Sequence, residues 1–169
     1  QRTEVGILAD PKAALTELSV AIERSMSGPE RTSANSRTQI ILAEKEAKQN
    51  QWKDHVKKKW DHNPISPERM IAEIAKTLPP DVIIADDAVT TSLPLHNTIS
   101  FNRPGSVYTG RGGALGWGIG GAMGLKLANP DHPVIAIVGD GSAMMTIQGL
   151  WTAANYNIPV VYIICNNQN

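Results

Sequence analysis

The sequence predicts an α/β fold, an open parallel sheet with helices on both faces, preceded by a helical linker. Two apolar runs of strand length, residues 134–138 and 160–165, flank a segment whose apolar residues recur at helical spacing. Strands that are apolar along their whole length are typical of parallel sheets covered on both faces. A third run, residues 82–85, ends in Asp86 and Asp87. We expect these strands to form a sheet that is incomplete within the 169 residues.

The composition excludes several classes of protein. The chain has 16 Lys+Arg and 16 Asp+Glu, and its net charge of zero argues against a nucleic-acid partner or a membrane surface bound through bulk charge. No apolar run approaches the roughly 18 residues that a membrane span needs. A single cysteine excludes a disulfide scaffold and a Cys-based zinc site. Because Gln1 begins no signal-peptide pattern, the cytoplasm is the expected location.

The first residues predict the tail of a preceding domain, residues 1–27. Residues 5–9 are apolar and predict a short strand. Asp10 and Pro11 then supply an N-cap and a first-turn proline. The apolar residues that follow at helical spacing are Leu15, Leu18, Ile22 and Met26.

Residues 28–62 predict a linker and a charged helix. Residues 27–38 are polar and rich in Ser, Thr, Gly and Pro, which is typical of a linker. Residues 43–60 predict a helix with Trp52, Val56 and Trp60 on one stripe. Its three consecutive lysines at 57–59 are typical of a solvated helix face, and we do not take them as a nucleic-acid site.

Residues 63–169 predict a ligand-binding domain. Ser66, Pro67 and Glu68 start a helix, and residues 143–156 predict another with Met144, Ile147 and Trp151 in the core. Polar residues that we expect to be flexible follow or end three strands, namely residues 86–91, 139–142 and 166–169. Because the carboxyl ends of parallel strands share one edge of a sheet, we expect an anionic ligand there.

One short motif leaves a dinucleotide-binding oxidoreductase open as an alternative. Residues 116–121 fit the pattern G-x-G-x-x-G, and Asp140 lies 19 residues further on at the end of an apolar run. The pattern should follow directly from a buried strand, but residues 109–113 before it are mostly glycine. The match is therefore weak support for a dinucleotide.

A longer motif is more specific. Gly139, Asp140 and Gly141 are separated by 24 residues from Asn166 and Asn167, and each group follows an apolar run. This pattern resembles the cofactor-binding signature of thiamine diphosphate enzymes, which opens with GDG and closes with NN. Residues 113–159 are similar to the branch of benzoylformate decarboxylase and acetolactate synthase. The resemblance covers about residues 64–169 and implies a thiamine diphosphate-binding fold truncated at its C-terminus, with residues 1–27 as the tail of the family's middle domain.

The resemblance implies two cofactors, thiamine diphosphate and Mg²⁺. Since Mg²⁺ takes oxygen ligands, the implied metal ligands are the side chains of Asp140 and Asn167 and the backbone carbonyl of Asn169. The carbonyl of Gly113 would face the aminopyrimidine, and Leu115 would hold the cofactor bent. The residues implied to contact the cofactor are Thr90, Thr91, Gly113, Leu115, Gly139, Asp140, Gly141, Ser142 and Asn167.

Two further expectations concern the backbone at the GDG motif and the hydroxyl residues near Val89. Gly139 and Gly141 are expected to let the backbone turn tightly and approach the phosphate. Val89 stands where the decarboxylase branch would have a hydroxyl, so the contact of Thr90 and Thr91 is the least defined.

The resemblance implies decarboxylation of a 2-oxo acid substrate, with acetolactate synthase-like carboligation as the alternative. It places no catalytic residue in this chain. The activating glutamate and the substrate-handling histidines are expected on a pyrimidine-binding domain, supplied by the partner subunit of a homodimer or homotetramer. His96 is expected to be a solvated loop histidine, and the chain alone is expected to be inactive.

Overall fold

The computed structural model describes residues 3–167, and the chain divides into two compact units, residues 1–48 and 49–169. The first unit contains α1 (Pro11–Ser25) and the beginning of α2 (Gly28–Lys58). The predicted cap is confirmed, because Asp10 Oδ1 accepts a hydrogen bond from the Ala13 amide at 2.9 Å. The strand predicted at residues 5–9 is wrong. That segment is irregular, since no described strand lies beside it to pair with its backbone.

Residues 28–38, part of the segment predicted to be a linker, are helical and form the first turns of α2. A capping box explains the helix. The Ser27 amide donates to Glu30 Oε2 at 2.7 Å, and the Ser27 hydroxyl lies 3.5 Å from the Glu30 amide. Pro29 in the first turn costs no hydrogen bond there, so a composition typical of a linker is compatible with a helix start.

The second unit contains a four-stranded sheet in which every pairing is parallel, as predicted. The strand order is β2-β1-β3-β4. The strands are β1 (Ile83–Asp87), β2 (Val107–Thr109), β3 (Val134–Gly139) and β4 (Val161–Cys165). The sequence did not predict β2, which has only three residues and pairs with β1 alone.

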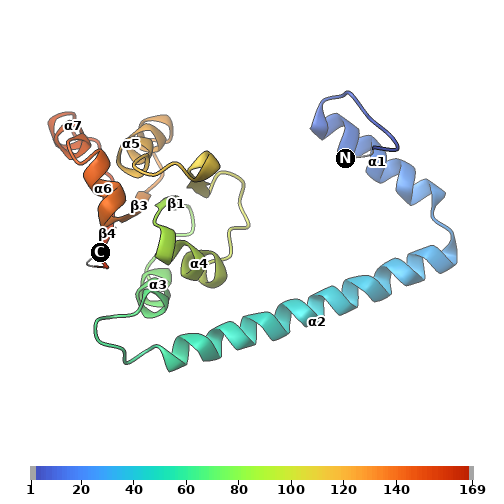
Figure 1. Ribbon diagram of the computed structural model, residues 1–169. Coiled ribbons are helices and arrows are strands. Elements are labelled where there is room, and N and C mark those ends of the chain that lie inside the picture. Colours follow the sequence, from blue (N-terminus) through green and yellow to red (C-terminus); the bar gives the residue numbers. More distant parts are fainter. Residues whose placement is uncertain (1–2, 168–169) are drawn as a thin grey trace. The chain divides into compact units, whose positions relative to one another are not determined.

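Helices cover both faces of this sheet (Figure 1). They are α3 (Pro67–Ala75), α4 (Val89–Thr98), the 3₁₀ helix η1 (Arg111–Gly113), α5 (Gly118–Ala128), α6 (Asp140–Met145) and α7 (Gly149–Asn155). Alternate strand residues point to opposite faces. Ile83 and Ala85 belong to a core that includes residues of α5 and α6, whereas Ile84 and Ile137 belong to a core with α3 and α4. The predicted fold class is therefore confirmed.

The single helix predicted over residues 143–156 is wrong. It is interrupted at residues 146–148, which separate α6 from α7. The interruption changes which side chains face the sheet: Ala143 and Ala153 are buried. The predicted core residues Met144, Ile147 and Trp151 are instead 69%, 39% and 68% exposed.

Residues 86–91 are not a flexible segment. Asp86 and Asp87 complete β1, and α4 begins at Val89. The helix escaped prediction because it contains Pro94 and lacks a clear apolar stripe. At the other end of the sheet, β4 pairs with β3 alone among the described strands, and its residues are exposed or partly buried, so it is less buried than its apolar sequence predicts.

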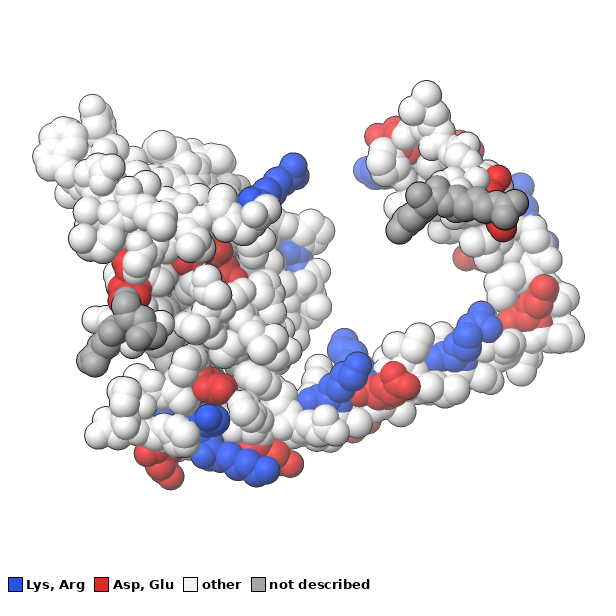
Figure 2. Space-filling model, in the orientation of Figure 1, with Lys and Arg blue, Asp and Glu red and all other residues white. Residues whose placement is uncertain are grey.

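Charge is distributed unevenly along the chain. Figure 2 shows Lys and Arg side chains along α2, and no Lys or Arg follows Lys126 in the sequence. Within residues 3–167, the structure contains no helix of the length and hydropathy that a membrane crossing requires.

Candidate functional site

The carboxyl ends of three strands are level with one another, as the sequence predicts. Asp87 at the end of β1 pairs with Val138, and Gly139 at the end of β3 pairs with Cys165 at the end of β4. Asp140 follows β3 directly, and Asn167 lies two residues beyond β4. These strand ends bring the polar segments that follow them to one edge of the sheet.

A cavity of about 260 Å³ lies at this edge, between the end of β1 and the glycine-rich loop (residues 110–117). It is lined by Asp86, Asp87, Ala88, Val89, Ser92, Thr109, Gly110, Gly113, Ala114, Leu115 and Trp117. Two of the predicted site residues, Gly113 and Leu115, thus lie together, with Val89 also in the lining. Leu115 is 47% exposed, so its side chain is available for contact with a ligand. Gly113 has φ +73°, a left-handed conformation that favours glycine.

No role for Asp87 was predicted from the sequence, although its side chain accepts three hydrogen bonds at this edge. It is 4% exposed, and its Oδ2 accepts from the Gly116 amide (3.1 Å), the Gly118 amide (2.9 Å) and the Ser142 hydroxyl (2.6 Å). The available signal was the pair of aspartates that ends a buried apolar run. Carboxylates are rarely placed in such a position unless they are satisfied by donors.

Asp86 is also buried and organises a second set of contacts. Its Oδ2 accepts from the Ser92 hydroxyl at 2.6 Å and lies 3.3 Å from His96 Nε2. His96 is exposed, as predicted, but the expected loop is wrong, because the residue lies on α4 and its ring reaches a buried carboxylate. Ser92, which directly follows Thr90 and Thr91 in the sequence, is the member of this hydroxyl run that lines the cavity.

The two predicted threonines have different environments. Thr90 is exposed, whereas Thr91 is buried and its side chain hydrogen-bonds the Cys165 thiol. Burial raises the pKa of Cys165; the bond from Thr91 opposes this, and the charges of Asp86 and Asp140 add to it. Thr90 is therefore the member of the pair that a ligand could reach from solvent.

The GDG segment passes from β3 into α6 without a linking residue, and neither of its glycines is needed there for a left-handed conformation. Gly139 has φ −65°, and neither Gly139 nor Gly141 adopts the left-handed conformation. At Gly141 the lack of a side chain leaves open space instead: no neighbouring atom lies within 4 Å of the position that a Cβ would take. This open space beside the start of α6 fits close approach of a phosphate group.

Ser142 is buried, and its hydroxyl is engaged within the protein. It donates to Asp87 and accepts from the Gly116 amide at 2.7 Å. The backbone amide of Ser142 belongs to the first turn of α6, where amides lack partners within the helix. The amide is therefore the group of Ser142 that suits contact with an anion.

The predicted metal ligands are one carboxylate and amide or carbonyl oxygens. Asp140 is partly buried and Asn167 is exposed, while Asn169 lies outside the described residues. Residues 3–167 contain no group of three His, Cys, Asp or Glu side chains arranged to hold a metal. A single carboxylate with oxygen donors from amides and from a bound phosphate is the kind of set that Mg²⁺ accepts. The residues present thus fit a metal that is shared with an anionic ligand.

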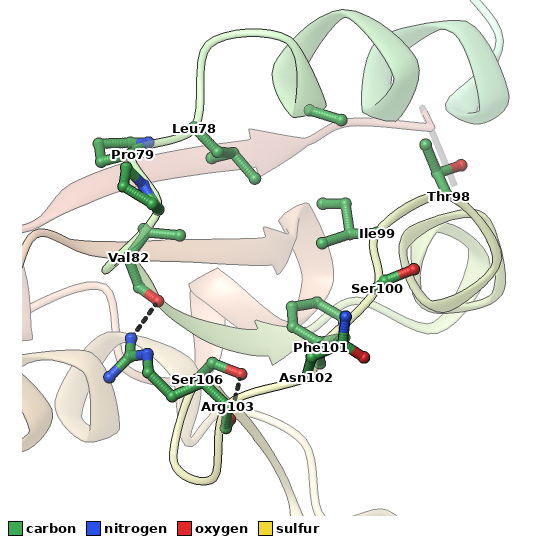
Figure 3. A pocket seen from close by; sticks show the side chains of 12 residues that line it. Leu78, Pro79, Val82, Thr98, Ile99, Ser100, Phe101, Asn102, Arg103 and Ser106 are labelled. Atoms are coloured by element: carbon green, nitrogen blue, oxygen red, sulfur yellow. Dashed lines mark hydrogen bonds between the residues drawn. The ribbon is translucent and has the colours of Figure 1, made fainter.

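A second cavity, of about 370 Å³, lies near the amino ends of β1 and β2 (Figure 3). Leu78, Ile99 and Phe101 give it apolar walls. Arg103 is its cationic group, and the guanidinium already donates to the carbonyls of Asp81 (2.8 Å) and Val82 (3.1 Å). Ligands of open α/β sheets bind at the opposite, carboxyl edge. The cavity beside the glycine-rich loop is therefore the stronger candidate.

The sheet order argues against the dinucleotide alternative. In the dinucleotide-binding fold, the strand before the glycine motif and the strand before the acidic residue are neighbours. Here β2 precedes the glycines and β3 precedes Asp140, but β1 lies between them. The geometry that lets one acid bind the ribose of a dinucleotide is therefore absent from the described sheet.

Comparison with known proteins identifies relatives of this site. Residues 87–169 match the family model "Thiamine pyrophosphate enzyme, C-terminal TPP binding domain". The chain is 38% identical over 104 residues to benzoylformate decarboxylase from Pseudomonas aeruginosa, covering 62% of this chain and 20% of that protein. It is 33% identical over 121 residues to the acetolactate synthase large subunit of Haemophilus influenzae, covering 70% and 21%.

A solved structure with the same fold is the thiamine diphosphate-dependent 4-hydroxybenzoylformate decarboxylase of Rhodococcus jostii RHA1. The TM-score is 0.59 at 40% identity, and the match covers 61% of this chain and 20% of that chain. The chain thus spans about a fifth of the length of the relatives that it matches.

Proposed function

We propose, from the premise that residues 87–169 belong to the C-terminal thiamine diphosphate-binding domains of thiamine pyrophosphate enzymes, that this chain forms the diphosphate side of the active site of a 2-oxo acid decarboxylase. The observation that carries the proposal is the level edge where β1, β3 and β4 end, with Asp140 and Asn167 beyond two of these strands. The decarboxylase activity of the full-length enzyme that contains this chain is likewise proposed.

The diphosphate end would be held through Mg²⁺ and backbone amides. Asp140 and Asn167 would supply side-chain oxygens to the metal, and Asn169 its carbonyl. The open space beside Gly141 would admit a phosphate, and the amides of the first turn of α6 would donate to it. Because no Lys or Arg follows Lys126, the metal would supply the positive charge that this end requires.

The aminopyrimidine end would occupy the cavity beside the glycine-rich loop. The Gly113 carbonyl would accept a hydrogen bond from the ring amino group, and the exposed Leu115 would press against the bent cofactor. Thr90 would contact it from the first turn of α4, where Val89 offers no hydroxyl. Holding two reacting parts of a molecule close together is a proximity effect that is worth several orders of magnitude in rate.

Thiamine diphosphate, when bound, supplies an electron sink for the loss of CO₂ from a 2-oxo acid. The residues of this chain would orient the cofactor and limit water around it. The glutamate that activates it would come from a pyrimidine-binding domain of a partner subunit, in a homodimer or homotetramer. A cytoplasmic location accords with this class of chemistry.

Carboligation of the acetolactate synthase type is the second candidate. It is supported by 33% identity to the Haemophilus large subunit over a longer stretch of the chain than the decarboxylase match covers. The two activities share the cofactor and differ in whether a proton or a second carbonyl compound captures the product of CO₂ loss. Residues that make this choice touch the substrate, and the proposal assigns none of them to this chain.

Isothermal titration of the full-length protein with thiamine diphosphate and Mg²⁺ tests the cofactor assignment. Loss of a residue that only orients a metal ligand costs about 10–100-fold in metal affinity. Asp140→Ala removes a proposed ligand itself, so it should weaken metal-dependent binding of thiamine diphosphate by at least about 100-fold. Asp131→Ala, at an exposed acid in the turn before β3, is the matched control and should bind normally. Unchanged affinity in Asp140→Ala would refute the metal assignment, and binding of a dinucleotide in place of thiamine diphosphate would refute the function.

Product analysis separates the two activities. The proposal expects CO₂ release from benzoylformate with aldehyde as the product. With pyruvate as the substrate, joining of two molecules with loss of one CO₂, to give acetolactate and no free aldehyde, would favour the second candidate.

A further inference from the structure

Asp87 joins parts of the site that are far apart in the sequence. Its Oδ2 accepts from amides 29 and 31 residues away in the glycine-rich loop and at the start of α5, and from a hydroxyl 55 residues away in α6. One carboxylate oxygen therefore contacts both the segment that carries Leu115 and the segment that carries Asp140.

The Gly116 peptide is held on both of its sides. Its amide donates to Asp87 and, at 2.7 Å, to the Ser142 hydroxyl. Its carbonyl accepts from the Thr146 hydroxyl at 2.8 Å. Ser142 and Thr146, near the two ends of α6, thus fix the two peptide groups that flank Gly116.

Two glycines permit this close packing. Gly116 has φ +86°, and a Cβ there would lie 2.8 Å from the Met145 Cβ. A Cβ at Gly118 would lie 2.6 Å from the Asp87 Cβ and 3.0 Å from its Oδ2. Side chains at either position would separate the loop from β1 or α6, so the contacts of Asp87 depend on their absence.

A carboxylate suits this position better than a neutral side chain. Three donors converge on one oxygen, and a charged acceptor makes shorter and stronger hydrogen bonds than an amide oxygen does. An asparagine would keep the shape but would offer a weaker acceptor and two donors of its own. With the amide oxygen in the place of Oδ2, the two amides and the hydroxyl would keep an acceptor, but all three hydrogen bonds would be weaker because that acceptor is uncharged.

We infer that Asp87 is a positioning residue, which holds the glycine-rich loop against the start of α6 and thereby sets the distance between the aminopyrimidine side and the diphosphate side of the cofactor site. The inference rests on the proposed function for the identity of the ligand. Nothing in the proposed contacts with thiamine diphosphate involves the Asp87 side chain itself, which acts through Gly116 and Ser142.

Hydrogen–deuterium exchange on the full-length protein without cofactor tests directly whether Asp87 holds the glycine-rich loop in place. In Asp87→Asn, amides of residues 110–118 should exchange at least about 10-fold faster, as loss of about 1.4 kcal/mol of local stability implies. Exchange in β3 and α3 should stay unchanged. Asp131→Asn, which alters an exposed acid in the turn before β3, should leave all of these rates unchanged.

Titration with thiamine diphosphate and Mg²⁺ then tests the positioning role. Asp87→Asn should weaken binding by about 10–100-fold, the range observed for residues that orient a binding group indirectly. Unchanged exchange in residues 110–118, or unchanged cofactor affinity, would overturn the inference. Faster exchange throughout the sheet would also overturn it, because that result indicates a general structural role.

A second variant covers the case in which Asp87→Asn does not fold. Ser142→Ala removes one acceptor of the Gly116 amide but leaves Asp87 in place, and it should give a smaller change in the same direction. Unchanged loop exchange in Ser142→Ala would overturn the inference. If the unaltered protein fails to bind thiamine diphosphate while the exchange results are as expected, the proposed function is refuted. The role of Asp87 in holding the glycine-rich loop is then still supported.

Discussion

Substitution of Gly118 by alanine is the most direct test of packing at the start of α5. The new Cβ would lie 2.6 Å from the Asp87 Cβ, 3.0 Å from Asp87 Oδ2 and 3.1 Å from Val138 Cγ2. Carbon atoms in contact normally lie about 3.5–4.0 Å apart, so either α5 or the end of β1 must move by several tenths of an ångström. Extra atoms in a well-packed core cost about 1–3 kcal/mol.

Two further effects act on the same variant. Movement of the helix lengthens the bond from the Gly118 amide to Asp87, and a hydrogen bond to a charged group is worth about 1.5–3 kcal/mol. Alanine gains roughly 0.5–1 kcal/mol over glycine within a helix, which offsets part of the cost. We expect the free energy of unfolding to fall by about 2–4 kcal/mol in Gly118→Ala.

The same helix provides the control. Gly120 lies two residues further along α5, and no atom lies within 4 Å of where its Cβ would be. Gly120→Ala should therefore raise the free energy of unfolding by roughly 0.5–1 kcal/mol. Urea unfolding of both variants, followed by circular dichroism, measures the difference. The packing argument fails if Gly118→Ala proves as stable as Gly120→Ala.

Two other predictions concern stability. Ser66→Ala should lower the free energy of unfolding by about 1–2 kcal/mol in urea unfolding, because the Ser66 hydroxyl caps α3 through the Arg69 amide and also donates to the Lys59 carbonyl; a variant of unchanged stability would show that the cap is dispensable. Burial raises the pKa of both Cys165 and Tyr162, so each group favours its protonated form in the fold. Their contribution to stability is complete below the unfolded pKa, about 8.5 for cysteine and about 10 for tyrosine, and is lost as the pH rises through the raised values. Urea midpoints should therefore fall from about pH 8.5 upward, less steeply in Cys165→Ala, and identical pH profiles for the two proteins would contradict the role of Cys165.

Much of the fold was predictable because the signals were local. The strands β3 and β4 are continuous apolar runs, and α1 and α3 begin at capping residues that the sequence displays directly. The level edge of the sheet followed from parallel pairing alone. In contrast, α4 carries Pro94 and β2 has three residues, so neither has the periodicity on which sequence prediction depends.

The parts of the site that escaped prediction depend on contacts between distant segments. Asp87 gains its partners from residues 29 to 55 positions away, and no local pattern specifies them. The break between α6 and α7 is another case, since the Thr146 side chain there bonds to the carbonyl of Gly116 in a separate loop. The predicted core stripe of Met144, Ile147 and Trp151 was wrong: the expected single helix is interrupted at residues 146–148, and all three side chains are exposed.

The outer side of β4 has a consequence for how this protein must be handled. β4 hydrogen-bonds to β3 alone among the described strands, and its Val161 and Ile164 are exposed. An unpaired strand edge with apolar side chains is a template for strand addition by another chain. Because Val161 and Ile164 are three residues apart and point to opposite faces of the sheet, apolar surface lies on both faces beside this edge. Any preparation that leaves the edge uncovered will tend toward aggregation at high concentration.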